Sequence, residues 1–200
     1  MIFEKGHFRS SRLEKSFINE SLNKIKTFSA KSTYDTKTTL FLSHKHKDLE
    51  EIEEATGVIE LLEDLGVKVY IDSMDNKMPD QTSGDTAARI KEVIKYCDKF
   101  ILLATAKAIE SYWCNWELGI GDVHKFQKHI AILPVKEKGQ YNHQYKGNEY
   151  LQIYPHIDYE GGTAKYTNGK IIPKGYYVAK PRNKEGIRII TSLKTWLNQR

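Results

Sequence analysis

The stretch Glu110–Asp122 reads Glu-Ser-Tyr-Trp-Cys-Asn-Trp-Glu-Leu-Gly-Ile-Gly-Asp. Ser111 is a favourable N-cap, and the residues after it have the pattern of an amphipathic helix. Trp113 and Glu117 are four positions apart, so a helix places them on one face, one turn apart. An indole beside a carboxylate can bind a sugar or heteroaromatic ring and stabilise positive charge on it. Two core tryptophans and a solvated glutamate would give the same pattern. Whether Trp113 and Glu117 are functional or structural therefore depends on the rest of the chain.

The composition is typical of one folded domain with a sizeable core, since 40% of the 200 residues are hydrophobic and 28% are charged. No apolar run approaches the ~20 residues that cross a bilayer, so we expect no membrane association. Residues 1–7 lack the apolar core of a signal peptide. Cys97 and Cys114 form neither a CxxC pair nor a metal-ligand spacing. We therefore expect reduced thiols, a cytoplasmic protein and no metal site.

The net charge of +5 is concentrated near the start of the chain. Residues 1–37 contain eight Lys/Arg and four Asp/Glu, so the remainder is nearly neutral. Binding to nucleic acid requires a concentrated basic face. The charge pattern does not favour such a face, and we predict no nucleic-acid partner.

Residues 1–38 are predicted to form an arm. Within it, segment 11–26 has apolar residues near helical spacing, which predicts an amphipathic helix: Leu13, Phe17, Leu22 and Ile25. Segment 27–38 is rich in Ser, Thr and Lys and poor in apolar residues, which is typical of a linker. The main domain is therefore predicted to span residues 39–200, with its core at 39–135 and a C-terminal part at 136–200.

Predicted strands and helices alternate along the core. Strands are predicted at 39–43, 67–72, 99–105 and 129–135, and helices at 49–65, 84–97 and from Ser111 to about Phe126. This alternation predicts right-handed βαβ units and a mostly parallel sheet with helices on both faces. The fold class is therefore α/β, a flavodoxin-like doubly wound sheet of about five strands in the order 2-1-3-4-5, preceded by the helical arm.

The C-terminal part has a weaker pattern. Residues 151–158 predict a fifth strand. The pair Asn168-Gly169 is a strong turn signal, so residues 159–180 are predicted to form a small hairpin at the sheet edge. Residues 184–198 have apolar positions at helical spacing and predict a terminal helix.

Polar side chains follow three of the predicted strands. They are Ser43, His44, Lys45 and His46 after the first strand, Asp72 and Asp75 after the second, and Trp113 and Glu117 after the third. Ligands of doubly wound sheets bind outside the carboxyl ends of the strands, so these groups are predicted to surround one crevice. The His and Lys residues can attract a pyrophosphate, although a solvated loop explains each of them equally well. The convergence favours a functional Glu117 at the mouth of that crevice.

Three segments resemble the TIR (Toll/interleukin receptor) domain family. Phe41-Leu-Ser-His44 is similar to the first sequence box of that family, and Val69-Tyr-Ile-Asp72 to its second strand. Residues 73–83 correspond to its BB loop. Ser111-Tyr-Trp-Cys-Asn-Trp-Glu-Leu118 resembles the S-x-W-C-x-x-E-L segment of bacterial and plant members. The similarity spans residues 39–135 in the correct order; residues 136–200 match loosely, and the arm does not match.

This resemblance implies an enzyme that cleaves NAD+, with Glu117 as the catalytic carboxylate and Trp113 contacting the substrate ring. His44, Lys45 and His46 fall where the family lines its site after the first strand, and Asp75 and Met78 fall in the BB loop, which lies across the substrate of a neighbouring subunit. Ser43 and Asp72, at the ends of the first two predicted strands, are predicted to bind substrate with them. NAD+ is then substrate, and no cofactor is expected. The resemblance also implies self-assembly through residues 73–83. Bacterial members of this type often serve antiphage defence of the Thoeris kind, making a cyclic ADP-ribose signal for an effector protein.

Two other functions remain open from the residues. A TIR domain without catalysis would act as an adaptor that assembles signalling complexes. A nucleoside deoxyribosyltransferase has a similar fold and also cleaves an N-glycosidic bond near a glutamate. The presence of both Trp113 and Glu117 favours the NAD+-cleaving enzyme, since an adaptor does not require that pair. The sequence does not distinguish a linear from a cyclic product.

Overall fold

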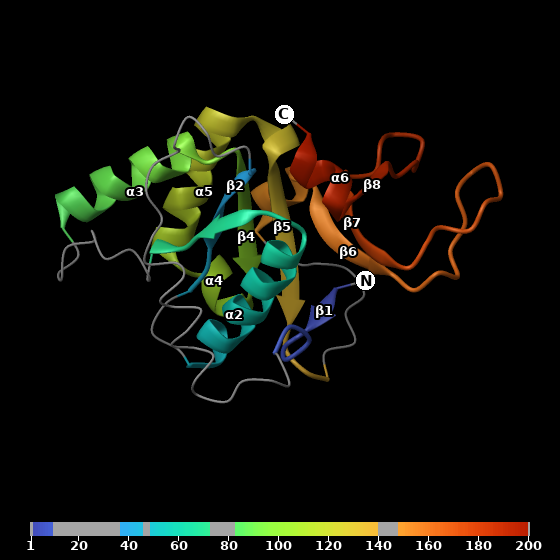
Figure 1. The fold of residues 1–200 in the computed structure, drawn as a ribbon, viewed down its shortest axis with the longest axis horizontal. Helices are drawn as coiled ribbons and strands as arrows, with labels where there is room; N and C mark the ends of the chain where they lie inside the picture. The colour runs from blue at the N-terminus through green and yellow to red at the C-terminus, as the bar shows by residue number, and fades with distance from the viewer. Residues whose placement is uncertain (1, 10–36, 46–48, 73–82, 140–147, 200) are drawn as a thin grey trace.

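One sheet forms the centre of the described structure (Figure 1). The computed structural model describes residues 2–9, 37–45, 49–72, 83–139 and 148–199. The strands are β1 (Phe3–Glu4), β2 (Thr39–Ser43), β3 (Lys68–Tyr70), β4 (Lys99–Ala104), β5 (Ile130–Lys136), β6 (His156–Glu160), β7 (Gly175–Ala179) and β8 (Ile190–Ser192). Their order is β3-β2-β4-β5-β6-β7-β8, and β1 pairs with β5. Neighbours from β3 to β6 are parallel, so the predicted order 2-1-3-4-5 is confirmed.

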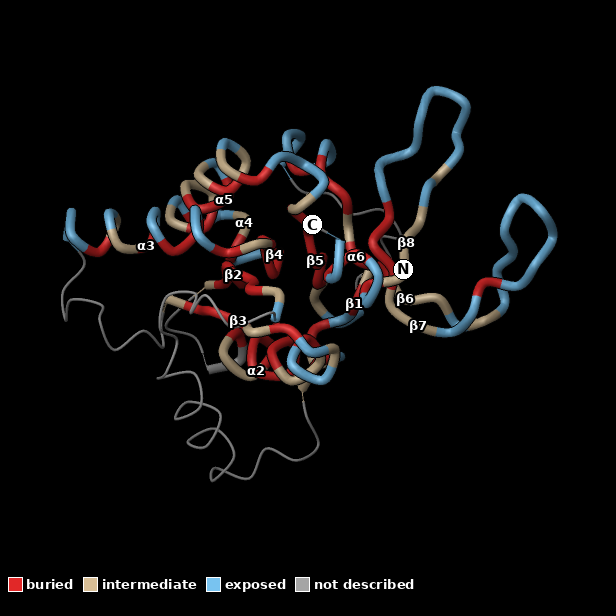
Figure 2. Tube along the Cα trace, turned by 45° about the horizontal axis from the view of Figure 1, so that its top comes forward, coloured by how far each residue is buried: buried red, intermediate tan, exposed pale blue. Residues whose placement is uncertain are grey.

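Helices cover both faces of the sheet, as predicted (Figure 2). The longer ones are α2 (Leu49–Asp64), α3 (Gly84–Tyr96) and α5 (Tyr112–Lys125). Alternate residues of β2 point to opposite faces. Leu40 and Leu42 pack in one core cluster with α2, whereas Phe41 packs in the other with α3 and α5. Every residue of β2 and of β4 is buried, which is why both read as continuous apolar runs.

Local sequence fixes where the helices begin. Ser83 and Thr86 form a reciprocal capping box at the start of α3. Thr105 accepts a hydrogen bond from the Ala108 N–H and begins the short α4 (Ala106–Ile109). Ser111 accepts from the Cys114 N–H and begins α5, which confirms the predicted N-cap.

The C-terminal part adds an antiparallel edge. The 3₁₀ helix η3 (Glu149–Ile153) occupies the first half of the predicted fifth strand, which is confirmed only from His156 as β6. β6 and β7 are antiparallel and form a hairpin, but its first strand is the predicted fifth strand and not a separate strand within 159–180. Its connection carries an isolated bridge between Lys165 and Ile171, closed by Gly169 at a φ of 81°. This connection projects from the domain (Figure 2).

The predicted helix at 184–198 is wrong over most of its length. Only Leu193–Asn198 is helical, as α6, and Ile190–Ser192 forms β8 against β7. Two features explain the difference. Gly186 has a φ of 75°, which favours a turn, and the β-branched run before Ser192 favours a strand. Ser192 then accepts from the Thr195 N–H and starts the helix there.

The first residues of the chain contribute to the sheet, which the sequence analysis did not predict. Phe3 and Glu4 pair with the end of β5, opposite Val135 and Lys136. Phe3 and Phe8 are buried in the core cluster that contains α2. The predicted helix at 11–26 lies outside the described residues, so it stays a prediction.

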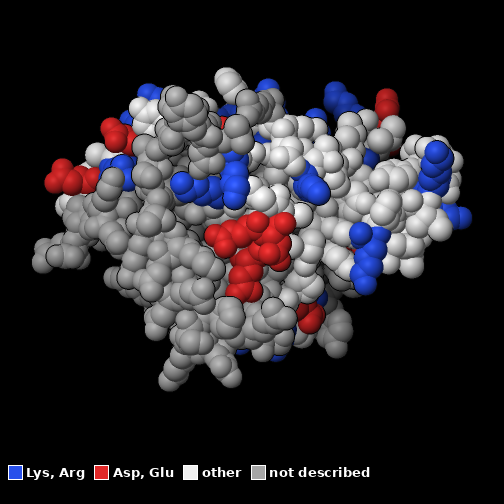
Figure 3. Space-filling view, viewed as in Figure 1, with Lys and Arg blue, Asp and Glu red and all other residues white. Residues whose placement is uncertain are grey.

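Surface charge is uneven. Acidic side chains gather over α2 on the face seen in Figure 3, whereas Lys and Arg are dispersed there. Glu63 and Asp64 are exposed in the last turn of α2. No described helix combines the length and apolar character that a membrane crossing requires.

Gly57 of α2 provides a test of the packing between α2 and the first residues of the chain. A Cβ at Gly57 would lie 1.4 Å from the Phe8 carbonyl oxygen, so Gly57→Ala must displace backbone. We expect Gly57→Ala to lower the free energy of unfolding by about 1–3 kcal/mol. Gly119→Ala in α5 is the matched control, because its Cβ meets nothing within 4 Å. It should gain about 0.5–1 kcal/mol through helix propensity. Urea unfolding measures both; a Gly57→Ala variant as stable as wild type would contradict the close packing.

Candidate active site

Glu117 lies in the second turn of α5 and is fully buried, with 0% of its surface exposed. The helix packs on the sheet through Cys114 and Leu118, and Glu117 lies on the same inward side. α5 follows β4 after only the short α4, so the carboxylate is carried to the carboxyl ends of the parallel strands. The alternative that Glu117 is a solvated surface charge is therefore excluded. The expectation that it lies at the open mouth of a crevice is also wrong in this structure, because surrounding residues cover it completely.

Ser43, the last residue of β2, reaches the same point. Its hydroxyl donates a hydrogen bond of 2.5 Å to Glu117 Oε2, and Ser43 is itself buried. The two residues are 74 positions apart in sequence. The predicted meeting of the segments after the first and third predicted strands is therefore observed.

The environment of Glu117 opposes its ionisation. Burial raises the pKa of Glu117 well above its ordinary value of 4.5, and the negative charge of Asp72 raises it further. The Ser43 hydroxyl and the Trp113 side chain lower the pKa, but by less. Asp72 follows β3, so the segment after the second predicted strand also faces the carboxylate. Among the described residues no hydrogen bond of normal geometry reaches Glu117 Oε1.

The loop after β2 is attached to the start of α5. The Cys114 thiol donates to the His44 carbonyl oxygen at 3.4 Å, and Lys45 Nζ donates to Ser111 Oγ at 3.5 Å. His44 is buried and Lys45 is half-buried. These contacts fix the loop beside Glu117. Burial, and then the charge of Glu117, raise the pKa of the Cys114 thiol to about 11, which fits a packing role and not a nucleophile.

Trp113 is half-buried one turn before Glu117. Its ring packs against that of Trp116, with centroids 5.1 Å apart and planes inclined by 36°. A spacing of three on a helix makes these two indoles neighbours. His46, Asp75 and Met78 lie outside the described residues, so their assignment stays a prediction.

A cavity of about 580 Å³ lies elsewhere, lined by Asp122, Phe126, Gln127, Lys128, Ile153, Pro155, Lys180 and Pro181. None of the predicted site residues lines it. Within the described part of the chain, no three His, Cys, Asp or Glu side chains are grouped to hold a metal ion. The described residues of the site offer the chemistry of a desolvated carboxylate beside the indole of Trp113.

These features define a class: a doubly wound α/β domain with a buried carboxylate at the carboxyl edge of its parallel strands. The chain matches the TIR domain family over residues 40–169, and it belongs to that family. It is 33% identical over 153 residues to a probable 3' cyclic ADP-D-ribose synthase, ThsB', of Bacillus cereus (strain MSX-D12), covering 76% of this chain and 72% of the relative. A solved 2-deoxyribosyltransferase from Bacillus psychrosaccharolyticus covers 68% of this chain and 98% of its own, with 14% identity and a TM-score of 0.43.

Proposed function

We propose that this protein cleaves the bond between nicotinamide and ribose in NAD+ and closes the ADP-ribose into a cyclic signal for antiphage defence. The main support for this proposal is the buried carboxylate of Glu117 in a TIR domain. It accepts a hydrogen bond from Ser43, and the charge of Asp72 acts on it. The relative named as a probable 3' cyclic ADP-D-ribose synthase supports the cyclic product. Cys97 and Cys114 are buried and form no disulfide, which fits a reducing cytoplasm.

A single carboxylate is enough for this bond. Ordinary glycosidases use two carboxyl groups because the leaving alkoxide must be protonated. Nicotinamide in NAD+ already carries a positive charge, so it leaves as a neutral ring without an acid. The enzyme must then stabilise the positive charge that develops on the ribose, and Glu117 supplies a negative charge for it.

Desolvation makes that charge effective. An ion pair is stronger in a water-excluded site than in water. The raised pKa of Glu117 means that the free protein favours the protonated form more than an exposed glutamate does. A bound pyridinium ring lowers the pKa again, because a nearby positive charge favours the carboxylate. Substrate binding thus generates the form of Glu117 that stabilises the transition state.

The other residues take supporting roles. Ser43 orients Glu117 through Oε2, which leaves Oε1 for a ribose hydroxyl. Trp113 provides a ring surface for nicotinamide or ribose. His44, Lys45 and His46 attract the pyrophosphate, and Asp72 tunes the charge of Glu117.

Assembly is part of the proposal. The complete burial of Glu117 requires a change before NAD+ can reach it. We assign that change to self-assembly through residues 73–83, with Asp75 and Met78 contacting substrate bound to a neighbouring copy. The product is then sensed by an effector protein. The same burial also fits an adaptor in which Glu117 performs no chemistry, so the experiment must separate the two.

Product analysis tests the proposal. We expect purified protein, incubated with NAD+ over a range of protein concentrations, to release nicotinamide and a cyclic isomer of ADP-ribose, with a rate per molecule that rises with concentration. Chromatography against synthetic standards identifies the products. Linear ADP-ribose alone would contradict the cyclase and leave a hydrolase. Release of no nicotinamide at any concentration would contradict the enzyme and favour the adaptor.

A further inference from the structure

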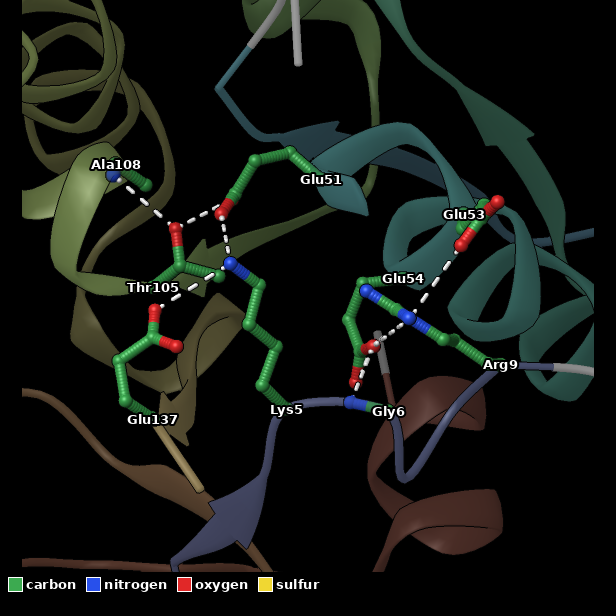
Figure 4. Close-up of polar contacts among 9 residues, drawn as sticks. All are labelled: Lys5, Gly6, Arg9, Glu51, Glu53, Glu54, Thr105, Ala108 and Glu137. Carbon is green, nitrogen blue, oxygen red and sulfur yellow. Dashed lines mark hydrogen bonds and ion pairs between the residues drawn. The ribbon is translucent and has the colours of Figure 1, made fainter. Parts of the chain in front are cut away.

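The first residues of the chain pair in parallel with the carboxyl end of β5, on the side of the sheet where β2 ends at Ser43. β1 pairs with β5 at Val135 and Lys136, and the segment then continues along α2. Figure 4 shows Lys5 between side chains from α2 and from the end of β5. We call residues 3–9 the N-terminal strap.

Lys5 is buried among acidic groups. Its Nζ lies 3.6 Å from Glu51 Oε1 and 3.4 Å from Glu137 Oε1. Only 8% of the surface of Lys5 is exposed, and Glu51 is fully buried. Removing such charges from water is costly unless they are paired, so the strap and α2 depend on each other at this point.

Glu51 continues the chain of contacts to β4. Its Oε2 accepts a hydrogen bond of 2.5 Å from Thr105 Oγ1. The same hydroxyl accepts from the Ala108 N–H at 3.2 Å and so caps α4. One oxygen of Thr105 thus joins the start of α2 to the start of α4, as Figure 4 shows.

Both ends of this connection lead to the proposed site. α2 is the next helix after β2, which ends at Ser43. α4 ends at Ile109, and Ser111 then caps the helix that carries Glu117. The connection therefore links α2 to the start of α4, and each of these elements is adjacent in the chain to one of the segments that meet at Ser43 and Glu117.

We propose that Lys5, Glu51 and Thr105 are positioning residues that hold Glu117 against Ser43 in the reactive arrangement. This inference rests on the proposed function for its effect on rate. Its structural part, the control of residues 105–114 by the strap, stands without it. None of the three residues touches the Glu117 carboxylate, so the effect acts through the start of α4 and α5.

The strap offers a matched control. Glu4 is the neighbour of Lys5, and its Oε1 pairs with Lys136 Nζ at 3.2 Å on the surface. Glu4→Gln removes a strap ion pair without reaching Thr105. Glu51→Gln keeps an oxygen that can accept from Thr105 but removes the charge that Lys5 faces. Lys5→Met removes the ammonium, and Lys5→Arg restores a cation.

Hydrogen exchange and kinetics on the full chain together test the proposal. We expect Lys5→Met and Glu51→Gln to accelerate amide exchange of residues 105–114 by about tenfold, with Glu4→Gln and Lys5→Arg within about twofold of wild type. For nicotinamide release by Lys5→Met and Glu51→Gln, we expect kcat to fall by roughly 10- to 100-fold with KM within about twofold of wild type. Misplacement of Glu117 affects the reaction more than it affects substrate binding.

Amide exchange is measured without NAD+. It therefore tests whether the strap holds residues 105–114 in place even if the protein releases no nicotinamide. Unchanged exchange of residues 105–114 in both variants would overturn it. So would an equal acceleration throughout the protein, or the same acceleration in Glu4→Gln. If Lys5→Met does not fold, Thr105→Val compared with Thr105→Ser replaces it, and only the loss of the hydroxyl should accelerate exchange.

Discussion

Glu117→Gln is expected to reduce nicotinamide release by about 10³-fold or more while the fold remains intact. Glutamine has the shape of glutamate but no negative charge, so it cannot offset the positive charge that develops on the ribose. Its side-chain oxygen can still accept the hydrogen bond from Ser43, which is the contact that Glu117 Oε2 now makes. The variant therefore separates charge from packing.

Trp113→Ala is a less informative change, because losing a large ring removes packing as well as substrate contact. The Trp113 ring packs against Trp116, and its loss would disturb both. Glu117→Gln is therefore the variant to measure. Circular dichroism and a thermal melt show whether it is folded, and initial rates at saturating NAD+ measure the loss of nicotinamide release.

Glu117→Gln is also expected to be more stable than wild type at neutral and alkaline pH. Burial and Asp72 raise the pKa of Glu117 above its ordinary value of 4.5, so the folded protein holds a proton that the unfolded chain releases. This contribution to stability is fully present below about pH 4.5 and is lost as pH rises through the raised pKa. Glutamine does not titrate, so it avoids the loss.

The difference has a defined pH dependence. We expect Glu117→Gln to exceed wild type by about 1–3 kcal/mol in free energy of unfolding at pH 8, the cost of a buried, poorly compensated charge. The difference should shrink toward acid and become independent of pH below about pH 4.5. Urea unfolding of both proteins between pH 4 and pH 8 measures it. A difference that does not change with pH would show that Glu117 is not the perturbed group.

Much of the fold could be predicted because its signals are local. Strands such as β4 are continuous apolar runs, and Ser111 is a favourable cap directly before the helix it begins. The proximity of Ser43 and Glu117 followed from topology, since parallel strands bring their carboxyl ends to one edge. Residues 74 positions apart could therefore be placed together without a structure.

The failures have physical reasons as well. β1 contains two residues, too few for a periodic pattern, and its partner lies more than 130 positions later. The contact of Lys5 with Glu51 and of Glu51 with Thr105 depends on tertiary packing, and no spacing in the sequence indicates it. The terminal helix was predicted too long because Ile187 and Ile190 fit a helical period, whereas Gly186 forms a turn and Ile190 pairs with Ala179 of β7.

The complete burial of Glu117 could not be predicted either. Periodicity shows which face of α5 turns inward, but not how closely neighbouring loops cover that face. The structure places the Ser43 hydroxyl on the carboxylate and Asp72 close enough to raise its pKa, and Glu117 is 0% exposed. Burial makes the charge more effective once substrate is bound, and under the proposed function access of NAD+ depends on assembly.

Nicotinamide release by Glu117→Gln and by Glu110→Gln, at the same concentrations of protein and NAD+, tests the central claim most directly. Glu110 is exposed just before the N-cap of α5, so its substitution removes a carboxylate from the same segment outside the site. The account predicts a rate near that of wild type for Glu110→Gln and a loss of about 10³-fold or more for Glu117→Gln. Equal rates for wild type, Glu110→Gln and a folded Glu117→Gln would contradict it.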